Sequence, residues 1–273
     1  MYSFDYQRPA SLADALAAAG GDARFLAGGQ SLVQAMKLRL ASVPLLVDLG
    51  GIAELRGITV TAEAVAIGAM TRHAVVAHSP AVQAALPALA DLAEGIGDQM
   101  VRNMGTIGGS LANADPAACY PAAVLGLGAT IRTNQRSIAG DEFFTGLYET
   151  ALAPGEMIVS VSFPRVASAG YLKFKHPASR FAIVGVFVAR GNGGVRVGVT
   201  GAKACAFRAA AIESALTASF TPAAAAAVEL PADDMASDMH AGAEYRAALV
   251  SVLASRAVAK ALTWGHAPVK AGA

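Results

Sequence analysis

The sequence predicts an α+β protein, in which two linked α/β units are followed by a small antiparallel sheet packed with helices. Short apolar runs alternate with helix-like segments over more than the first half of the chain. Later, two β-rich runs at 181–189 and 195–200 are joined by a glycine- and asparagine-containing turn, which is typical of a hairpin. The chain has 273 residues, 55% hydrophobic and 15% charged, which suffices for a large core and excludes a disordered protein.

The first unit is predicted over residues 1–56. Ser11 precedes Asp14 at capping-box spacing, and Ser31 precedes Gln34 in the same way, so each serine is expected to begin a helix. The elements expected, in order, are a helix at 11–19 ended by two glycines, a strand at 23–27, a helix at 31–40 and a strand at 45–48.

The second unit is predicted over residues 57–168. Pro80 and Pro87 should divide one helical region into shorter helices, and Pro164 should end the last strand. An uncharged run at 116–131 is too short for a bilayer and contains prolines and glycines, so it indicates a buried helix and no membrane span. The remaining elements expected are a half-buried strand at 60–68, helical segments within 73–95, and strands at 129–133 and 157–163.

The third unit is predicted over residues 169–273. Its hairpin turn is expected at 190–194. Helical periodicity covers 207–219 and 243–264, and the alanine-rich stretch 222–228 is expected to be a surface helix or a loop.

Charge and cysteine content exclude several classes of protein. The 21 basic and 20 acidic side chains give a net charge of +1, which does not favour binding to nucleic acid or to an anionic membrane. Cys119 and Cys205 are far apart in the sequence, so neither a disulfide framework nor an iron-sulfur cluster is predicted in this chain. Asp5 and Arg8 stand where a secretory signal would be apolar, and a cytoplasmic location is therefore expected.

No catalytic or metal-binding residue is predicted. The chain lacks the common nucleotide-loop, zinc-protease and nucleophile-elbow motifs, and its five histidines do not cluster. His73 and His78 are expected to be solvated side chains at the edge of a helix. A hydrolase is accordingly not favoured.

Two glycine-containing loops, 27–31 and 106–110, stand at or near predicted helix starts. Glycine lets the backbone approach a ligand closely, and successive N–H groups followed by a helix can bind an anion. Together the loops could hold a pyrophosphate from two sides. Taken singly, a loop of this kind is more often only a tight turn.

The segments RFLAGGQSL (24–32) and QMVRNMGTIGGSLANADP (99–116) resemble the two FAD signatures of the molybdenum hydroxylases, the family of xanthine dehydrogenase and aerobic carbon monoxide dehydrogenase. Residues 199–202, 207–209 and 237–246 resemble the carbon monoxide dehydrogenase type of its medium subunit. The resemblance covers essentially the whole chain. It implies a two-part FAD-binding domain of the PCMH type followed by the C-terminal domain.

The resemblance also implies a function as the FAD-carrying electron-transfer subunit. Electrons would come from a large molybdopterin subunit through a small subunit with [2Fe-2S] clusters, and would leave FAD for an external acceptor. The family assembles as a dimer of heterotrimers. The substrate stays open, and so does the choice of NAD, a quinone, a cytochrome or oxygen as acceptor.

Matching the family's motifs position by position implies a set of cofactor-contacting residues. Ile96 and Ile158 could equally be core residues, and Lys175 could be a solvated charge on an edge strand. The set consists of Ala27, Gly28, Gly29, Gln30, Ser31, Leu32, Ile96, Thr106, Ile107, Gly108, Gly109, Ser110, Asp115, Cys119, Ile158, Lys175 and Phe181.

Two of these positions depart from the family's pattern. Cys119 stands where the family usually has Asp; Pro121 puts the helix start near Cys119, where cysteine is a poor N-cap. A small buried thiol is the simpler interpretation, and Asp115 or water could replace the missing contact. Phe181 stands where a tyrosine often covers the flavin ring, so stacking is kept and only a hydroxyl is lost.

Two other functions stay open. A stand-alone flavin-dependent oxidoreductase would need acid or base residues beside the ring, and none can be named from the sequence. A non-catalytic α/β interaction module would use the glycine loops only as turns. Bound FAD distinguishes the module from the other two, and turnover without partners distinguishes the oxidoreductase.

Overall fold

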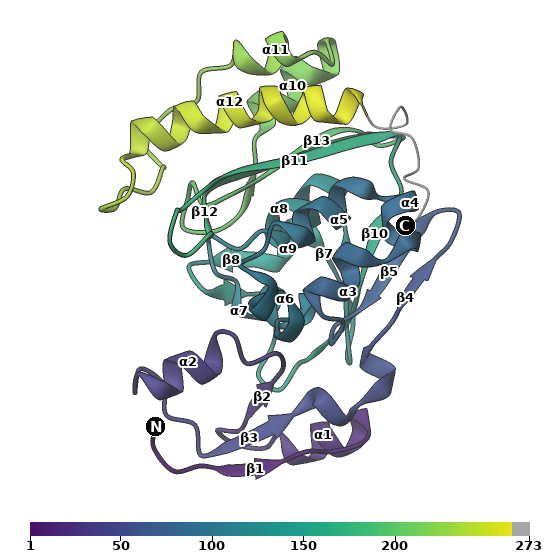
Figure 1. Ribbon diagram of the computed structural model, residues 1–273, viewed down its shortest axis with the longest axis vertical. Helices are drawn as coiled ribbons and strands as arrows, with labels where there is room; N and C mark the ends of the chain where they lie inside the picture. Colours follow the sequence, from purple (N-terminus) through teal and green to yellow (C-terminus); the bar gives the residue numbers. More distant parts are fainter. Residues whose placement is uncertain (264–273) are drawn as a thin grey trace.

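The computed structural model describes residues 1–263, which form three stacked units (Figure 1). The predicted α+β class is confirmed, while the boundaries 1–56, 57–168 and 169–273 stay predictions.

The strands are β1 (Asp5–Gln7), β2 (Arg24–Leu26), β3 (Leu45–Asp48), β4 (Ile58–Val60), β5 (Ala64–Gly68), β6 (Thr130–Thr133), β7 (Ser137–Ala139), β8 (Phe144–Gly146), β9 (Glu149–Thr150), β10 (Ile158–Pro164), β11 (Ser168–Lys175), β12 (Ala182–Gly191), β13 (Gly194–Thr200) and β14 (Phe207–Arg208). The helices are α1 (Leu12–Ala18), α2 (Leu32–Lys37), α3 (His73–His78), α4 (Pro80–Ala85), α5 (Pro87–Glu94), α6 (Gln99–Met104), α7 (Ile107–Asn113), α8 (Tyr120–Leu127), α9 (Gly140–Phe143), α10 (Ala210–Ala218), α11 (Pro222–Ala226) and α12 (Ala243–Leu262), with short 3₁₀ turns at Leu49–Gly51 and Ala53–Leu55.

The N-terminal unit is a parallel three-stranded sheet in the order β1-β3-β2. Ser11 caps α1 as predicted, because its Oγ accepts the Asp14 N–H at 3.1 Å. The predicted cap at Ser31 was wrong: its backbone is helical and its side chain makes no capping bond. The helix also ends before residue 40, because Arg39 takes a left-handed φ of 60° and Leu40 N–H bonds to Ala35 O, which closes a Schellman motif.

The central unit is built on a five-stranded sheet in the order β4-β5-β10-β6-β7. The single strand predicted at 60–68 was wrong, since the chain turns back after Val60 and forms the β4–β5 hairpin. Thr61 Oγ1 accepts the N–H groups of Glu63 and Ala64 and stabilises the turn. The divisions at the two prolines are confirmed, and the uncharged run forms α8, which is buried along its whole length.

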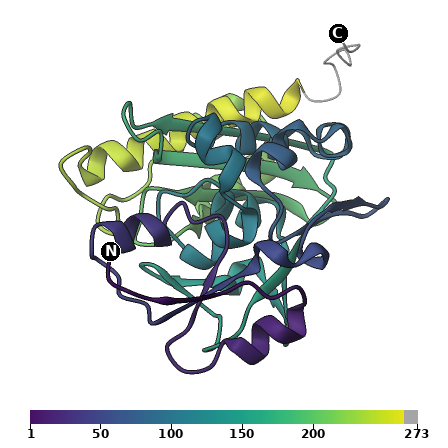
Figure 2. The same cartoon turned by 60° about the horizontal axis from the view of Figure 1, so that its bottom comes forward.

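The C-terminal unit is an antiparallel sheet in the order β11-β12-β13-β14. Side chains of β12 alternate: Val184, Val186 and Val188 pack toward α10 and α12, while Phe187 and Ala189 join the core of the central unit. Figures 1 and 2 show α12 lying across the outer face of this sheet. The sheet is therefore covered on both faces.

Three predictions about the C-terminal helices need comment. The helix predicted at 207–219 begins later, because Phe207 and Arg208 pair with β13 as a short strand. The stretch 222–228 contains a short helix. Residue 264, predicted as the end of the last helix, lies outside the described residues. Within residues 1–263 no helix is long and apolar enough to cross a bilayer.

Candidate functional site

A cleft of about 500 Å³ opens where the N-terminal unit meets the central unit and the β11–β12 turn. The first glycine loop, the segment from α6 to the start of α8, the start of β10 and the turn form its walls. Of the residues implied as cofactor contacts, those lining this cleft are Ala27, Gly28, Gly29, Gln30, Ser31, Leu32, Ile96, Thr106, Gly108, Gly109, Ser110, Asp115, Cys119, Ile158 and Phe181. Segments that are far apart in the sequence thus meet at one site.

The first glycine loop presents free backbone N–H groups to this cleft. Over residues 28–31 these amides have no backbone or side-chain acceptor among the residues that the structure describes. Gly29 has a left-handed φ of 71°, which turns the loop into α2. A run of unpaired N–H groups lining a cleft is a ready binding site for an anion.

The second loop was predicted to bind an anion through its backbone N–H groups, but these groups are already hydrogen-bonded within the protein. The N–H groups of Ile107 and Gly108 bond to the carbonyls of Thr71 and Ala69, at 3.1 and 2.8 Å. Those of Gly109 and Ser110 bond to Oγ1 and O of Thr106. These four amides are used internally, so the second loop supplies a rigid wall and its Ser110 hydroxyl, while the first loop supplies the amides.

At Gly28 the first loop contacts the α6–α7 turn, which directly precedes the second loop. A Cβ on this glycine would lie 2.2 Å from Met104 O and 2.7 Å from Gly105 Cα, which are both backbone atoms. Only glycine allows the first loop to approach the α6–α7 turn so closely. The position of the first loop, and with it that of the free amides, therefore depends on this residue.

The cleft also has an apolar lining. Ile96, Ile158 and Phe181 belong to it, and Phe181 is 46% exposed, which leaves its ring available to a flat ligand. Cys119 is buried at the N-cap of α8 and makes no capping bond, as expected for cysteine. Its Sγ instead accepts a hydrogen bond from Lys173 Nζ at 3.3 Å.

Two of the implied residues do not line the cleft. Ile107 is fully buried in the core of the central unit. Lys175 is exposed, and Lys173 occupies the cleft instead, where it also donates to Arg180 O at 2.7 Å. The pairing of β11 with β12 shifts between Phe174 and Lys175, so the alternation of β11 does not continue to Lys175.

The expectation for His73 was wrong. Its side chain is only 5% exposed and lines the cleft, whereas His78 is exposed and pairs with Glu94. Burial, with a smaller contribution from the Arg102 charge, lowers the pKa of His73 to about 4, so the ring is neutral at pH 7. Its ring packs against Tyr120 at a centroid distance of 5.3 Å, a contact no local sequence signal reveals.

Sequence reasoning also missed Asn113, Lys173 and Ser179, which line the cleft. Asn113 lies within the second signature, so its position there was the one signal available. Lys173 could have been found only from the register of β11 against β12.

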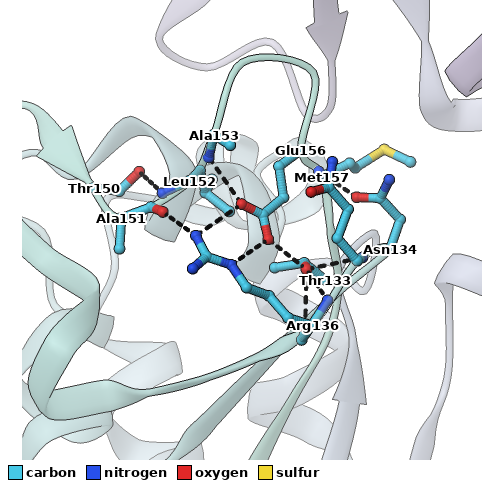
Figure 3. Close-up of polar contacts among 10 residues, drawn as sticks. Thr133, Asn134, Arg136, Thr150, Ala151, Leu152, Ala153, Glu156 and Met157 are labelled. Carbon is cyan, nitrogen blue, oxygen red and sulfur yellow. Dashed lines mark hydrogen bonds and ion pairs between the residues drawn. The ribbon is translucent and has the colours of Figure 1, made fainter.

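A buried carboxylate holds the segment before β10 against the cleft (Figure 3). The Glu156 side chain accepts hydrogen bonds from Arg136 Nε at 3.0 Å, Thr133 Oγ1 at 2.7 Å and Ala153 N at 2.8 Å. The Arg136 hydrogen bonds lower the pKa of Glu156 from 4.5 to about 2, against the opposing effect of burial. Met157, the next residue, lies in the cleft wall, so the network positions that wall.

We expect Glu156→Gln to lower the free energy of unfolding by about 2 kcal/mol at pH 7, because a buried acceptor of charged hydrogen bonds is lost. Since folding lowers this pKa, the stabilisation is fully present above pH 4.5 and is lost as the pH falls toward 2. Urea unfolding of both proteins at several pH values measures the difference. Glu63→Gln, at an exposed turn residue, is the matched control. A difference that stayed constant from pH 7 to pH 2.5 would contradict this assignment.

The fold and the cleft are those of a flavin-binding protein, and comparison with known families agrees. Residues 2–166 match the family described as the FAD binding domain in molybdopterin dehydrogenase. The chain belongs to this family, whose members are components of oxidoreductases, and the resemblance found in the sequence is confirmed.

The most informative relatives are medium chains of oxidoreductases. The carbon monoxide dehydrogenase medium chain of Hydrogenophaga pseudoflava is 35% identical over 93% of this chain and 96% of its own. The nicotine 6-hydroxylase medium subunit of Paenarthrobacter nicotinovorans is 35% identical over 94% and 96%. The crystal structure of quinoline 2-oxidoreductase from Pseudomonas putida 86 superposes with a TM-score of 0.85 and 30% identity, over 95% of this chain and 97% of that one.

Proposed function

We propose that this chain is the FAD-carrying electron-transfer subunit of a molybdenum-containing hydroxylase or dehydrogenase. The observation that carries the proposal is the pairing, in one cleft, of the free N–H groups of residues 28–31 with the exposed face of Phe181. A dinucleotide needs both features, an anion site for its pyrophosphate and an apolar wall for its flat ring. The residues present therefore fit FAD.

When bound, FAD accepts and releases the electrons, a chemistry that no side chain supplies. The first loop would hold the pyrophosphate, with Ser31 and Ser110 beside it. Ile96 and Phe181 would contact the flavin ring, and Ile158 would contact the adenine or the ring. His73, buried in the lining of the cleft, is neutral and adds no charge to the site.

The partners proposed are a large molybdopterin subunit and a small iron-sulfur subunit, in a dimer of heterotrimers. The names of the relatives support this, since they are medium chains of dehydrogenases and hydroxylases. The substrates in those names, carbon monoxide and nicotine, differ chemically although the medium chains are alike. We therefore propose that the substrate is selected in the molybdenum subunit and not in this chain.

The test is to purify the tagged chain gently from its native host and to record its absorption spectrum, its gel pattern and its molybdenum content. Flavin and iron-sulfur bands with two co-purifying chains are the expected result. Flavin without partners would overturn the subunit assignment in favour of a stand-alone oxidoreductase. Protein without flavin would overturn the assignment of the cleft.

Phe181→Tyr should leave the FAD content unchanged and alter the rate of flavin reoxidation by about two- to tenfold, the effect of one added hydrogen bond. The ring still stacks, so binding is preserved. Stopped-flow reoxidation and the flavin-to-protein ratio measure the two quantities. Phe181→Leu is the control, because it removes the ring and should lower the FAD content. A large loss of FAD in Phe181→Tyr would refute the stacking role.

A further inference from the structure

The turn between β11 and β12, residues 176–181, carries Phe181 into the cleft. Its segment 177–180 is exposed and belongs to neither strand, so the pairing of the strands does not fix its backbone. Arg180 has a left-handed φ of 62°, which is uncommon for a residue with a side chain. The conformation of the turn, and with it the place of the Phe181 ring, therefore depends on hydrogen bonds made within the turn.

One residue, His176, accepts every backbone N–H group of the exposed segment. Pro177 has none to donate. The N–H groups of residues 178–179 both donate to His176 Nδ1, at 3.2 and 3.3 Å, and the N–H of Arg180 donates to His176 O at 2.9 Å. The N–H of His176 in turn donates to Phe181 O at 2.8 Å, which closes the turn. Because Nδ1 is an acceptor here, the neutral ring carries its proton on Nε2.

The His176 ring is itself supported from the C-terminal unit. It packs edge to face on His240, with ring centroids 4.4 Å apart. The N–H of His240 donates to Asp238 Oδ1 at 2.8 Å, and Asp238 Oδ2 accepts a hydrogen bond from Nη2 of the buried Arg246 at 2.7 Å. A run of contacts thus joins a buried arginine to the side chain that organises the turn.

His176 can affect a ligand in the cleft only through the turn. It is not among the residues that line the cleft, whereas Ser179, Arg180 and Phe181 are. Of these three side chains, that of Phe181 can stack on a flat ring. A change in the conformation of the turn would therefore move the stacking ring relative to the ligand.

We propose that His176 is a positioning residue of this site, and that its Nδ1 holds the turn in the conformation that places Phe181 on the flavin. The proposal rests on the proposed function of the cleft. Without this acceptor the two N–H groups would bond to solvent water, and the turn would sample other conformations. FAD would then have to order the turn when it binds, which weakens its affinity.

Two substitutions separate the acceptor from the ring. His176→Phe keeps an aromatic ring against His240 and loses the acceptor, whereas His176→Asn loses the ring and keeps an acceptor oxygen that can bond to the N–H groups two and three residues on. FAD is titrated into the flavin-depleted full-length chain, and visible circular dichroism records the environment of the bound ring. We expect His176→Phe to weaken FAD binding about three- to tenfold and to change the dichroism, and His176→Asn to restore both toward the wild type. His78→Phe, at an exposed histidine of α3 outside the cleft, is the matched control and should bind FAD like the wild type.

A second background shows whether His176 acts through Phe181. In Phe181→Leu the stacking ring is already absent, so adding His176→Phe should weaken FAD binding by less than about twofold more. A further loss as large as that of His176→Phe alone would overturn the positioning role.

The remaining outcomes separate this role from the function of the cleft. Wild-type affinity in His176→Phe, or a loss in His176→Asn equal to that in His176→Phe, would overturn the role while leaving FAD binding by the wild type intact. A thermal melt accompanies each titration, and a general loss of folding in His176→Phe would also overturn it, since an exposed turn should not carry the fold. A wild-type chain that bound no FAD would overturn the proposed function itself, and this role with it.

Discussion

Gly28→Ala should weaken FAD binding by about ten- to a hundredfold, because its new methyl group would displace the first glycine loop. The new Cβ would lie 2.2 Å from Met104 O and 2.7 Å from Gly105 Cα, and neither backbone atom can rotate away. The first loop must then move off the α6–α7 turn and carry its free N–H groups out of place. Overpacking of this kind costs about 1–3 kcal/mol, and each 1.4 kcal/mol is tenfold in affinity.

The measurement is a titration of FAD into flavin-depleted protein, with a thermal melt to confirm that the variant is folded. Gly20→Ala is the matched control, because a Cβ there meets no atom within 4 Å and the backbone is not left-handed. It should bind FAD like the wild type. Wild-type affinity in Gly28→Ala would show that the contact between the loops does not position the amides.

Arg246→Met should lower the free energy of unfolding by about 2–4 kcal/mol, because two backbone carbonyls lose a charged hydrogen-bond donor. The guanidinium is 5% exposed. Its Nη1 donates to Ile183 O at 2.7 Å and Gly201 O at 2.6 Å, and its Nη2 donates to Asp238 Oδ2 at 2.7 Å. Methionine fills a similar volume but leaves buried carbonyls without a donor.

Thermal unfolding followed by circular dichroism measures this loss. Arg256→Met provides the comparison, since Arg256 lies on the same helix and is exposed. Its stability should stay within about 0.5 kcal/mol of the wild type, as is usual for surface substitutions. Equal melting temperatures for the two variants would contradict the role given to Arg246, which is to tie the start of α12 to β12 and to the end of β13.

Most of the secondary structure was predictable because its signals are local. The cap at Ser11, the prolines that divide α3 to α5 and the turn between β12 and β13 act within a few residues. Two elements were predicted with the wrong ends because the residue that ends or turns each of them is not of the type that usually does so. Arg39 ends α2 in a left-handed conformation that usually belongs to glycine, and Thr61 closes a hairpin inside an alternating run.

The sequence by itself determined the family and its two loop motifs, because those motifs are contiguous and long. Only the tertiary structure decided which groups are available at the site. His73 is buried by Gly105 and Tyr120, and the amides of the second loop are used by Ala69 and Thr71. Each of these contacts joins residues about 30 to 50 positions apart, so no local pattern contains it.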